Sequence, residues 1–193
     1  YLWGQRIDEN GNARWGANGH SVAHASSDPF GIAVVSDGFG GALVLFRDSI
    51  SWGGILTLDV LRAQRVAPDG TACWSSEIEL DFSDFSYLAI ASDAKGGAIV
   101  VWESDLNGAS NALITQRLDA AGSFLWGSGR MVAANVNCWV LLPKVVSDGS
   151  GGAVVAWMDQ EGTNNTNIYV QRLNQDGDFL WHERVPRCAA PGN

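Results

Sequence analysis

Short runs rich in β-branched and aromatic residues, separated by glycine-rich turns, recur along the chain. The clearest example begins with two such runs, 143–148 and 152–157, which flank a glycine-rich turn. A third run, 168–173, is followed by a turn ending in Asp176-Gly177 and then by 178–181, which ends in a tryptophan. Asp-Gly between such runs predicts a β-hairpin, and no stretch has apolar residues at helical spacing over three turns. The pattern predicts four antiparallel strands, with the tryptophan in the fourth.

Comparison of the chain with itself shows that this unit is repeated. The sequence Ser-Asp-x-x-Gly-Gly-Ala begins at Ser36, Ser92 and Ser147, at offsets of 56 and 55 residues. A second landmark, Gln-Arg followed by a glycine and then a tryptophan, occurs four times. Its glutamines are Gln5, Gln64, Gln116 and Gln171, and its tryptophans are Trp15, Trp74, Trp126 and Trp181. A period near 55 residues is typical of solenoid and propeller arrays.

A four-stranded unit of this length, rich in glycine and tryptophan, predicts an all-β fold built from β-propeller blades. Blades stack radially, so both apolar faces of each small sheet are covered. We predict about three and a half blades. They are a half blade at 1–27 with the third and fourth strands only, a first blade at 28–86, a second at 87–141, and a third with a C-terminal tail at 142–193.

The repeated aromatic and amide side chains are interpreted as framework. Tryptophans of the fourth strands, together with Phe46, Trp102 and Trp157 at the ends of the second strands, would fill the space between neighbouring blades. The alternative for these tryptophans is stacking on a sugar ring. The glutamines Gln64, Gln116 and Gln171 recur in every blade, which favours framework hydrogen bonding over a unique site.

These landmarks resemble the tandem propeller repeats of large secreted or surface-attached bacterial proteins. The resemblance rests on Ser147-Asp148-Gly149-Ser150-Gly151-Gly152-Ala153, on Trp157 and on Gln171-Arg172, and it extends over nearly the whole chain. It implies a propeller architecture and an extracellular or cell-surface location. It implies little about activity, because such repeats serve as scaffolds and binding modules beside many different domains.

Three and a half blades cannot close a ring, because propellers typically have 4 to 8 blades. The third blade already has all four strands, so the N-terminal half blade cannot complete it. We therefore expect the chain to be a segment of a longer protein, with an oligomer that shares a ring as the alternative. In either case further blades or subunits are its expected partners.

Charge narrows the list of partners. The chain has 12 Lys and Arg against 21 Asp and Glu, a net charge of -9. Nucleic acids and anionic membranes are therefore not expected to bind, since the cations that neutralise phosphates are too few. No apolar run approaches the roughly 18 residues of a membrane-spanning helix.

Loops of variable length are where binding residues are expected. The predicted loops between second and third strands are 48–58, 103–111 and 158–167, and those between blades are 16–28, 75–86 and 127–141. Both classes would emerge on one face of a propeller. The ligand-binding candidates there are Asp48, Asp105, Asp159 and the unrepeated Trp52 and Trp139. The two tryptophans could stack on a sugar or cap the core.

Two groups of residues in the predicted loops are candidate metal ligands. Glu77, Glu79, Asp81 and Asp84 offer oxygen ligands for Ca²⁺ but lack the spacing of a calcium loop, and a solvated acidic surface is the alternative. His20 and His24 lie four residues apart in a predicted loop without an evident third zinc ligand. We therefore predict no cofactor, with Ca²⁺ as the alternative.

No catalytic constellation is apparent. His182 lies beside a framework tryptophan, and neither a Gly-x-Ser-x-Gly elbow nor a phosphate-binding glycine loop is present. Cys73, Cys138 and Cys188 are an odd number, and Cys138 with Cys188 is the candidate disulfide pair. We predict a non-enzymatic scaffold or protein-interaction module that binds through its variable loop face. The alternatives are a carbohydrate-binding, lectin-like propeller and an accessory domain of a larger secreted enzyme.

Overall fold

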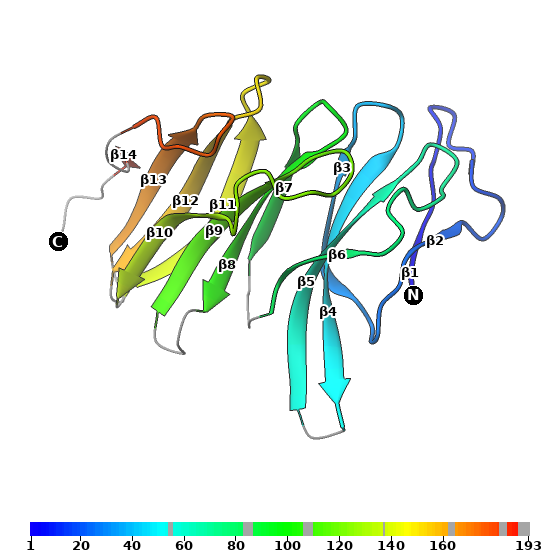
Figure 1. The fold of residues 1–193 in the computed structure, drawn as a ribbon, viewed down its shortest axis with the longest axis horizontal. Coiled ribbons are helices and arrows are strands. Elements are labelled where there is room, and N and C mark those ends of the chain that lie inside the picture. The colour runs from blue at the N-terminus through cyan, green and yellow to red at the C-terminus, as the bar shows by residue number, and fades with distance from the viewer. Residues whose placement is uncertain are drawn as a thin grey trace. The chain divides into compact units, whose positions relative to one another are not determined.

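The protein is all-β. The computed structural model describes residues 1–53, 56–82, 87–105, 110–136, 138–161, 165–181 and 185–188. These residues form one two-stranded and three four-stranded sheets, all antiparallel and without a helix (Figure 1). The expectations of an all-β chain and of four-stranded antiparallel sheets are confirmed.

The chain divides into two compact units, Tyr1–Ser83 and Asp84–Asn193. The first unit holds two sheets. Sheet 1 consists of β1 (Leu2–Gly4) and β2 (His20–Ala23). Sheet 2 consists, in spatial order, of β3 (Phe30–Ser36), β4 (Ala42–Trp52), β5 (Leu56–Val66) and β6 (Ile78–Asp81).

The second unit holds two four-stranded sheets. Sheet 3 consists of β7 (Leu88–Ser92), β8 (Ala98–Asp105), β9 (Ser110–Leu118) and β10 (Arg130–Val136). Sheet 4 consists of β11 (Cys138–Ser147), β12 (Ala153–Glu161), β13 (Asn165–Leu173) and β14 (Val185–Cys188). In each of these sheets every strand pairs with the strand next to it in sequence, so the sheet is a meander.

Within each unit the core lies between two sheets. In the second unit, Ile99, Val101 and Leu113 of sheet 3 pack in one buried cluster with Val155 and Leu173 of sheet 4. In the first unit, residues of both sheets share a buried cluster of Leu2, Val22, Ala23, Val44, Phe46 and Val66. Alternate residues of these strands face the neighbouring sheet, as the period of two requires.

The predicted position of the fourth strand is wrong. Trp74, Trp126 and Trp181 each lie in a bend, and the fourth strands β6, β10 and β14 begin four residues later. The reason is that a glutamine side chain of the third strand binds the backbone at the tryptophan. Gln64 accepts a hydrogen bond from the Trp74 N–H and donates one to the Trp74 carbonyl. Those backbone groups are then not available to a strand ladder.

Several predicted loops are also strands. β4 and β5 extend through 48–58 on both sides of residues 54–55, and β8, β9, β12 and β13 extend likewise into 103–111 and 158–167. Polar residues suggested loops here, but their side chains pair across the strands. Arg47 and Ser49, for example, both bind Asp59. Most of 127–141 lies in β10 and β11, which places Trp139 in a strand.

Candidate functional site

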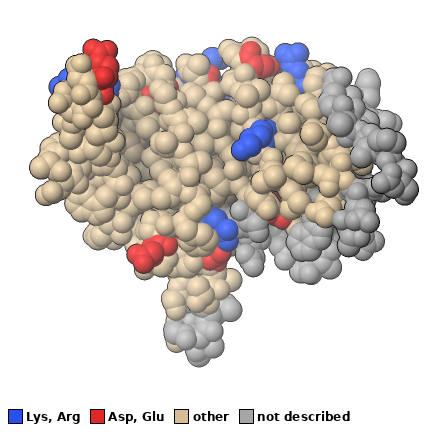
Figure 2. All heavy atoms as spheres, turned by 180° about the vertical axis from the view of Figure 1, so that it is seen from behind, with Lys and Arg blue, Asp and Glu red and all other residues tan. Residues whose placement is uncertain are grey.

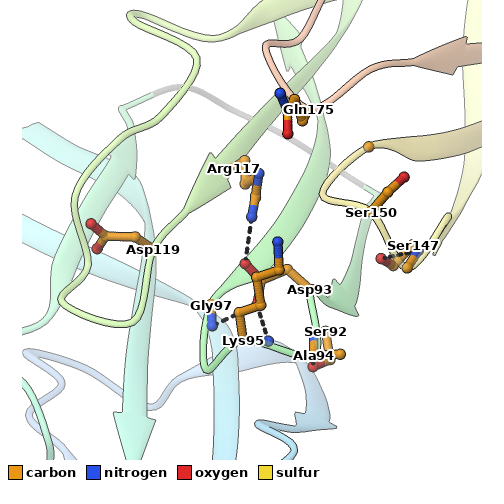
Figure 3. A network of polar contacts seen from close by, with 12 residues as sticks. Ser92, Asp93, Ala94, Lys95, Gly97, Arg117, Asp119, Ser147, Ser150 and Gln175 are labelled. Carbon is orange, nitrogen blue, oxygen red and sulfur yellow. Dashed lines mark hydrogen bonds and ion pairs between the residues drawn. The ribbon is translucent and has the colours of Figure 1, made fainter.

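Each Ser-Asp-x-x-Gly-Gly turn is organised around its aspartate. Asp93 Oδ1 accepts hydrogen bonds of 2.8 Å from the backbone N–H groups of Lys95 and Gly97 (Figure 3). Its Oδ2 binds the Arg117 guanidinium at 3.0 Å, and both residues are buried. Asp37 with Arg65 and Asp148 with Arg172 repeat this arrangement. The turn of the first two strands is thereby bound to the arginine of the third strand.

These contacts stabilise the ionised carboxylates. The backbone hydrogen bond from Ser150, followed by the Ser150 hydroxyl, Arg172 and the Gly152 N–H, outweighs burial and lowers the pKa of Asp148 from 3.8 to about 2. At Asp37, burial by itself raises the pKa, but hydrogen bonds from Phe39, Arg65 and Gly41 outweigh it and lower the pKa.

Acid is therefore expected to destabilise the fold through these turns. Because the pKa of Asp148 is lower in the folded state, its contribution is complete above about pH 4 and is lost as the pH falls from about 4 to 2. Between pH 6 and pH 2.5, the free energy of unfolding should fall by about 1–2 kcal/mol less in Asp148→Asn than in the wild type. Urea unfolding of the wild type and the variant at pH 6 and pH 2.5 measures it. Equal losses in the two proteins would contradict the prediction.

The repeated glutamine holds the backbone at the tryptophan. Gln116 Oε1 accepts hydrogen bonds from the N–H groups of Arg117 and Trp126, and Nε2 donates to the Gly127 carbonyl. Gln5 makes the same three contacts, with Arg6, Trp15 and the Gly16 carbonyl. Gln64 accepts from the N–H groups of Arg65 and Trp74 but donates to the Trp74 carbonyl. These hydrogen bonds fix the backbone at the tryptophan and thereby the direction in which its side chain points away from its own sheet.

That tryptophan joins neighbouring sheets. The Trp126 indole N–H donates to the Gln175 carbonyl of sheet 4 at 2.9 Å. A Cβ added to Gly177, in the same turn, would lie 2.7 Å from the Trp126 ring. In the first unit, Trp15 donates to the Pro68 carbonyl at 2.9 Å and lies against Gly70 in the same way. We call this contact the Trp–turn interlock.

A groove lies beside β1 in the first unit. It has a volume of about 370 Å³, and apolar groups make up most of its lining. β1 contributes one wall, and β3 and β4 contribute the other through Ile32, Val34 and Val44. Arg6 lines the groove as well. We call it the β1 groove.

The β1 groove exposes Val34, whose counterpart in sheet 4 is buried. Val34 lies two residues before Ser36, as Val145 lies two residues before Ser147. Val34 is 62% exposed, whereas Val145 is 9% exposed and belongs to the core between sheets 3 and 4. Val145 of sheet 4 packs in one cluster with Ala91 of β7 and Ile99 of β8, the first two strands of sheet 3. Val34 of sheet 2 has no such cover, because sheet 1 consists of β1 and β2 alone.

Arg6 differs from its repeat counterparts. Arg65, Arg117 and Arg172 each form an ion pair with a turn aspartate. Arg6 is exposed and donates to the Pro68 carbonyl at 3.2 Å. Among the described residues no carboxylate forms an ion pair with it.

The aspartates predicted to bind a ligand are placed differently from expectation. Asp48 lies in β4 and is fully buried. It accepts hydrogen bonds from the N–H groups of Ser26 and Ser27 and pairs with Arg62. Asp159 lies in β12 and is also fully buried. Their placement in exposed loops is therefore wrong. Asp105 ends β8, and its side chain lies outside the described residues.

The predicted sugar platforms have no described side chains. Trp52 ends β4 and Trp139 lies in β11, but only their backbones are described. Carbohydrate binding through them stays a prediction.

The acidic candidates for a metal site are engaged in other contacts. Glu77 accepts a hydrogen bond from the His24 N–H, Glu79 pairs with Arg62, and Asp81 accepts from the Phe82 N–H. Asp84 lies outside the described residues. Within the part of the chain that the structure describes, no group of three or more His, Cys, Asp or Glu could hold a metal ion.

The histidines and cysteines also lack the expected geometry. His20 packs edge-on against Trp15, and His24 against Tyr1. Cys138 begins β11 and Cys188 ends β14, at opposite edges of sheet 4. Three strand spacings, roughly 14 Å, separate those edges, which exceeds the Cα distance that a disulfide spans. The predicted pairing within one chain is therefore wrong. Cys73 is an exposed free thiol.

Comparison with known proteins finds no matching family model and no significantly similar curated protein. The described residues include no helix that is long and apolar enough to cross a membrane. On the face drawn in Figure 2, their charged side chains are scattered and form no continuous basic patch.

Sequence reasoning missed the β1 groove and the role of the repeated arginine. The Asp and Arg of each ion pair are separated by 28 residues in sheet 2 and by 24 in sheets 3 and 4. Both residue types recur at fixed positions in the repeat, and this joint recurrence was a usable signal. The same comparison identifies Arg6 as a fourth arginine at this repeat position.

Proposed function

We propose that this chain is a segment of a β-propeller and acts as a non-enzymatic scaffold for protein interaction. Its sheets would be blades stacked face to face, with sheet 1 as a half blade. The observation that carries the proposal is the Trp–turn interlock, which joins sheets at the same two repeat positions in both units. The same joint, repeated between successive sheets, would generate a regular array, as in repeat proteins.

The distribution of polar groups supports a structural role. The buried Asp37, Asp93 and Gln116 bind backbone groups, and the buried Asp48 binds Arg62. Buried polar groups that are satisfied in this way stabilise a unique arrangement of strands. An extracellular or cell-surface location is part of the proposal and rests on the resemblance of the repeats.

The Trp–turn interlock is tested by replacing the glycine that packs against the tryptophan ring with alanine. Gly177 has a φ of +79°, so alanine there is strained and also displaces the Trp126 ring. Gly11 has the same place in its repeat and a φ of +82°, but a Cβ there meets no atom within 4 Å. It is a matched control for the backbone strain.

We expect Gly11→Ala to lower the free energy of unfolding by about 1 kcal/mol. Gly177→Ala should lower the free energy of unfolding by about 1–3 kcal/mol more than Gly11→Ala does, because the added methyl group overpacks the turn against the indole. Denaturant unfolding followed by tryptophan fluorescence measures both. Equal losses would show that the interlock does not join the sheets, and turnover of a glycoside, ester or peptide by the purified chain would contradict the non-enzymatic role.

A further inference from the structure

Another hollow of the first unit lies between β2 and the segment that leads into β6. It has a narrower part of about 360 Å³ and a wider part of about 670 Å³. The two parts share His24, Ser76 and Glu77 and therefore form one cleft, which we call the β2–β6 cleft. Small-molecule sites typically have volumes of roughly 300–1,000 Å³, so the cleft has the size of a ligand site.

The lining of the cleft is mixed in chemistry. The polar side chains of the wider part are an imidazole, a guanidinium, two carboxylates and two hydroxyls, which belong to His24, Arg62, Glu77, Glu79, Ser26 and Ser76. The narrower part adds apolar groups, among them Val22, Ala23 and Trp74. Such a lining suits a ligand that carries polar groups on an apolar frame.

Arg62 is held at the cleft by two carboxylates. Its Nη1 pairs with Asp48 at 2.7 Å, and its Nη2 pairs with Glu79 at 2.9 Å. Burial raises the pKa of Asp48, but hydrogen bonds from Ser26 and Ser27 and the charge of Arg62 outweigh it and lower the pKa. The buried carboxylate therefore stays ionised and fixes the guanidinium in place, so the donor is preorganised for a ligand.

The two glutamates of the cleft each have one oxygen in use. Glu79 Oε1 accepts from Arg62, and Glu77 Oε1 accepts from the backbone N–H of His24. Within the described part of the chain, no donor binds the Oε2 of either glutamate. Glu79 and Arg62 thus present an acceptor beside a donor. Each hydroxyl group can donate and accept, so two neighbouring hydroxyls of a sugar ring can donate to Glu79 and accept from Arg62.

The charges of the cleft favour a neutral ligand. Glu77 and Glu79 repel an anion, and Arg62, which the buried Asp48 keeps in place, repels a cation. A neutral group that both donates and accepts hydrogen bonds meets neither penalty. The vicinal hydroxyls of a carbohydrate are such a group, and the C–H groups of the ring can lie on the apolar lining of the narrower part.

We propose that the β2–β6 cleft binds a carbohydrate through two vicinal hydroxyl groups, which donate to Glu79 and accept from Arg62. Glu77 and the Ser76 hydroxyl bind a further hydroxyl of the same ring. This site adds a ligand to the proposed scaffold and does not depend on the stacking of its sheets. It is also distinct from the two tryptophans that the sequence suggested as sugar platforms, Trp52 and Trp139.

The probes are the methyl α-glycosides of D-glucose, D-galactose and D-mannose, tested on the full chain by saturation-transfer difference NMR. We expect at least one of them to bind with a dissociation constant on the order of 1 mM, as a few hydrogen bonds in an open cleft provide. The fully O-methylated form of the same glycoside keeps the ring but cannot donate to the carboxylates. It should show no saturable binding.

Two variants remove the binding groups, and a third is the control. Glu79→Ala should weaken binding by about tenfold, because it removes the charged acceptor. Ser76→Leu should weaken it by at least about fivefold, because the larger side chain fills the cleft. Glu9→Ala makes the same change of charge at an exposed glutamate outside the cleft and should leave the affinity within about twofold of the wild type. All three positions are exposed, so the variants should fold, which circular dichroism checks.

The result that overturns the proposal is well defined. No binding of any of the three glycosides, equal binding of the O-methylated form, or equal affinities of Glu79→Ala and Glu9→Ala would each show that the cleft is not a carbohydrate site. Nα-acetyl-lysine methylamide is the competing probe. If it binds, if Glu79→Ala abolishes that binding and if the glycosides do not bind, the cleft takes a basic side chain of a protein and the carbohydrate assignment is wrong.

Discussion

Replacing Trp126 by alanine is expected to lower the free energy of unfolding by about 3–5 kcal/mol. The side chain is fully buried in the core between sheets 3 and 4. Its removal leaves a cavity beside Gly177 and deprives the Gln175 carbonyl of the indole N–H. Chemical denaturation of the full chain, followed by circular dichroism, measures the loss.

Two further variants separate packing from hydrogen bonding. Trp126→Phe keeps an aromatic ring but removes the N–H, so a loss of about 1 kcal/mol is expected beyond that of imperfect packing. Trp3→Ala is the control, because Trp3 is 61% exposed, and it should change stability by no more than about 0.5 kcal/mol. A Trp126→Ala variant as stable as Trp3→Ala would remove the basis for stacked sheets in the second unit.

Replacing Asp93 by alanine is expected to destabilise the protein by about 3–5 kcal/mol. The substitution leaves Arg117 buried without its carboxylate partner, and it removes the acceptor of the Lys95 and Gly97 N–H groups. Figure 3 shows that these contacts converge on one side chain.

Asp119 provides a matched control for the loss of the turn contacts alone. It accepts hydrogen bonds from the N–H groups of Ala121 and Ser123, also at two and four residues along the chain. It is less buried than Asp93. Asp119→Ala should therefore lower the free energy of unfolding by only about 1 kcal/mol, and Asp93→Asn should fall between the two. If both alanine variants lose the same stability in urea unfolding, the ion pair with Arg117 contributes nothing measurable.

The sequence predicted the strands where side-chain alternation and turn chemistry agree. The turns at Asp148 and Gly177 form locally, because Asp148 accepts hydrogen bonds from the N–H groups of Ser150 and Gly152 and Gly177 adopts a positive φ. Such features recur in every repeat, so comparison of the chain with itself was enough to find them.

The failures occurred where distant residues decide the structure. The bend at Trp74 depends on Gln64, which lies ten residues earlier, and the strand at Asp48 depends on Ser26, Ser27 and Arg62. Polarity alone suggested loops at Asp48 and Asp159. A polar side chain can lie in a buried strand when another element satisfies it, and a single sequence does not show that element.

The repeat length and the all-β class were determined by the sequence itself, because periodic turns and strand propensities act locally. Only the tertiary structure decided that Trp126 crosses to the turn of the next sheet, that Arg117 pairs with Asp93, and that Val34 and Arg6 line an open groove. Those contacts join residues far apart in the chain, and their geometry depends on how whole sheets pack against one another.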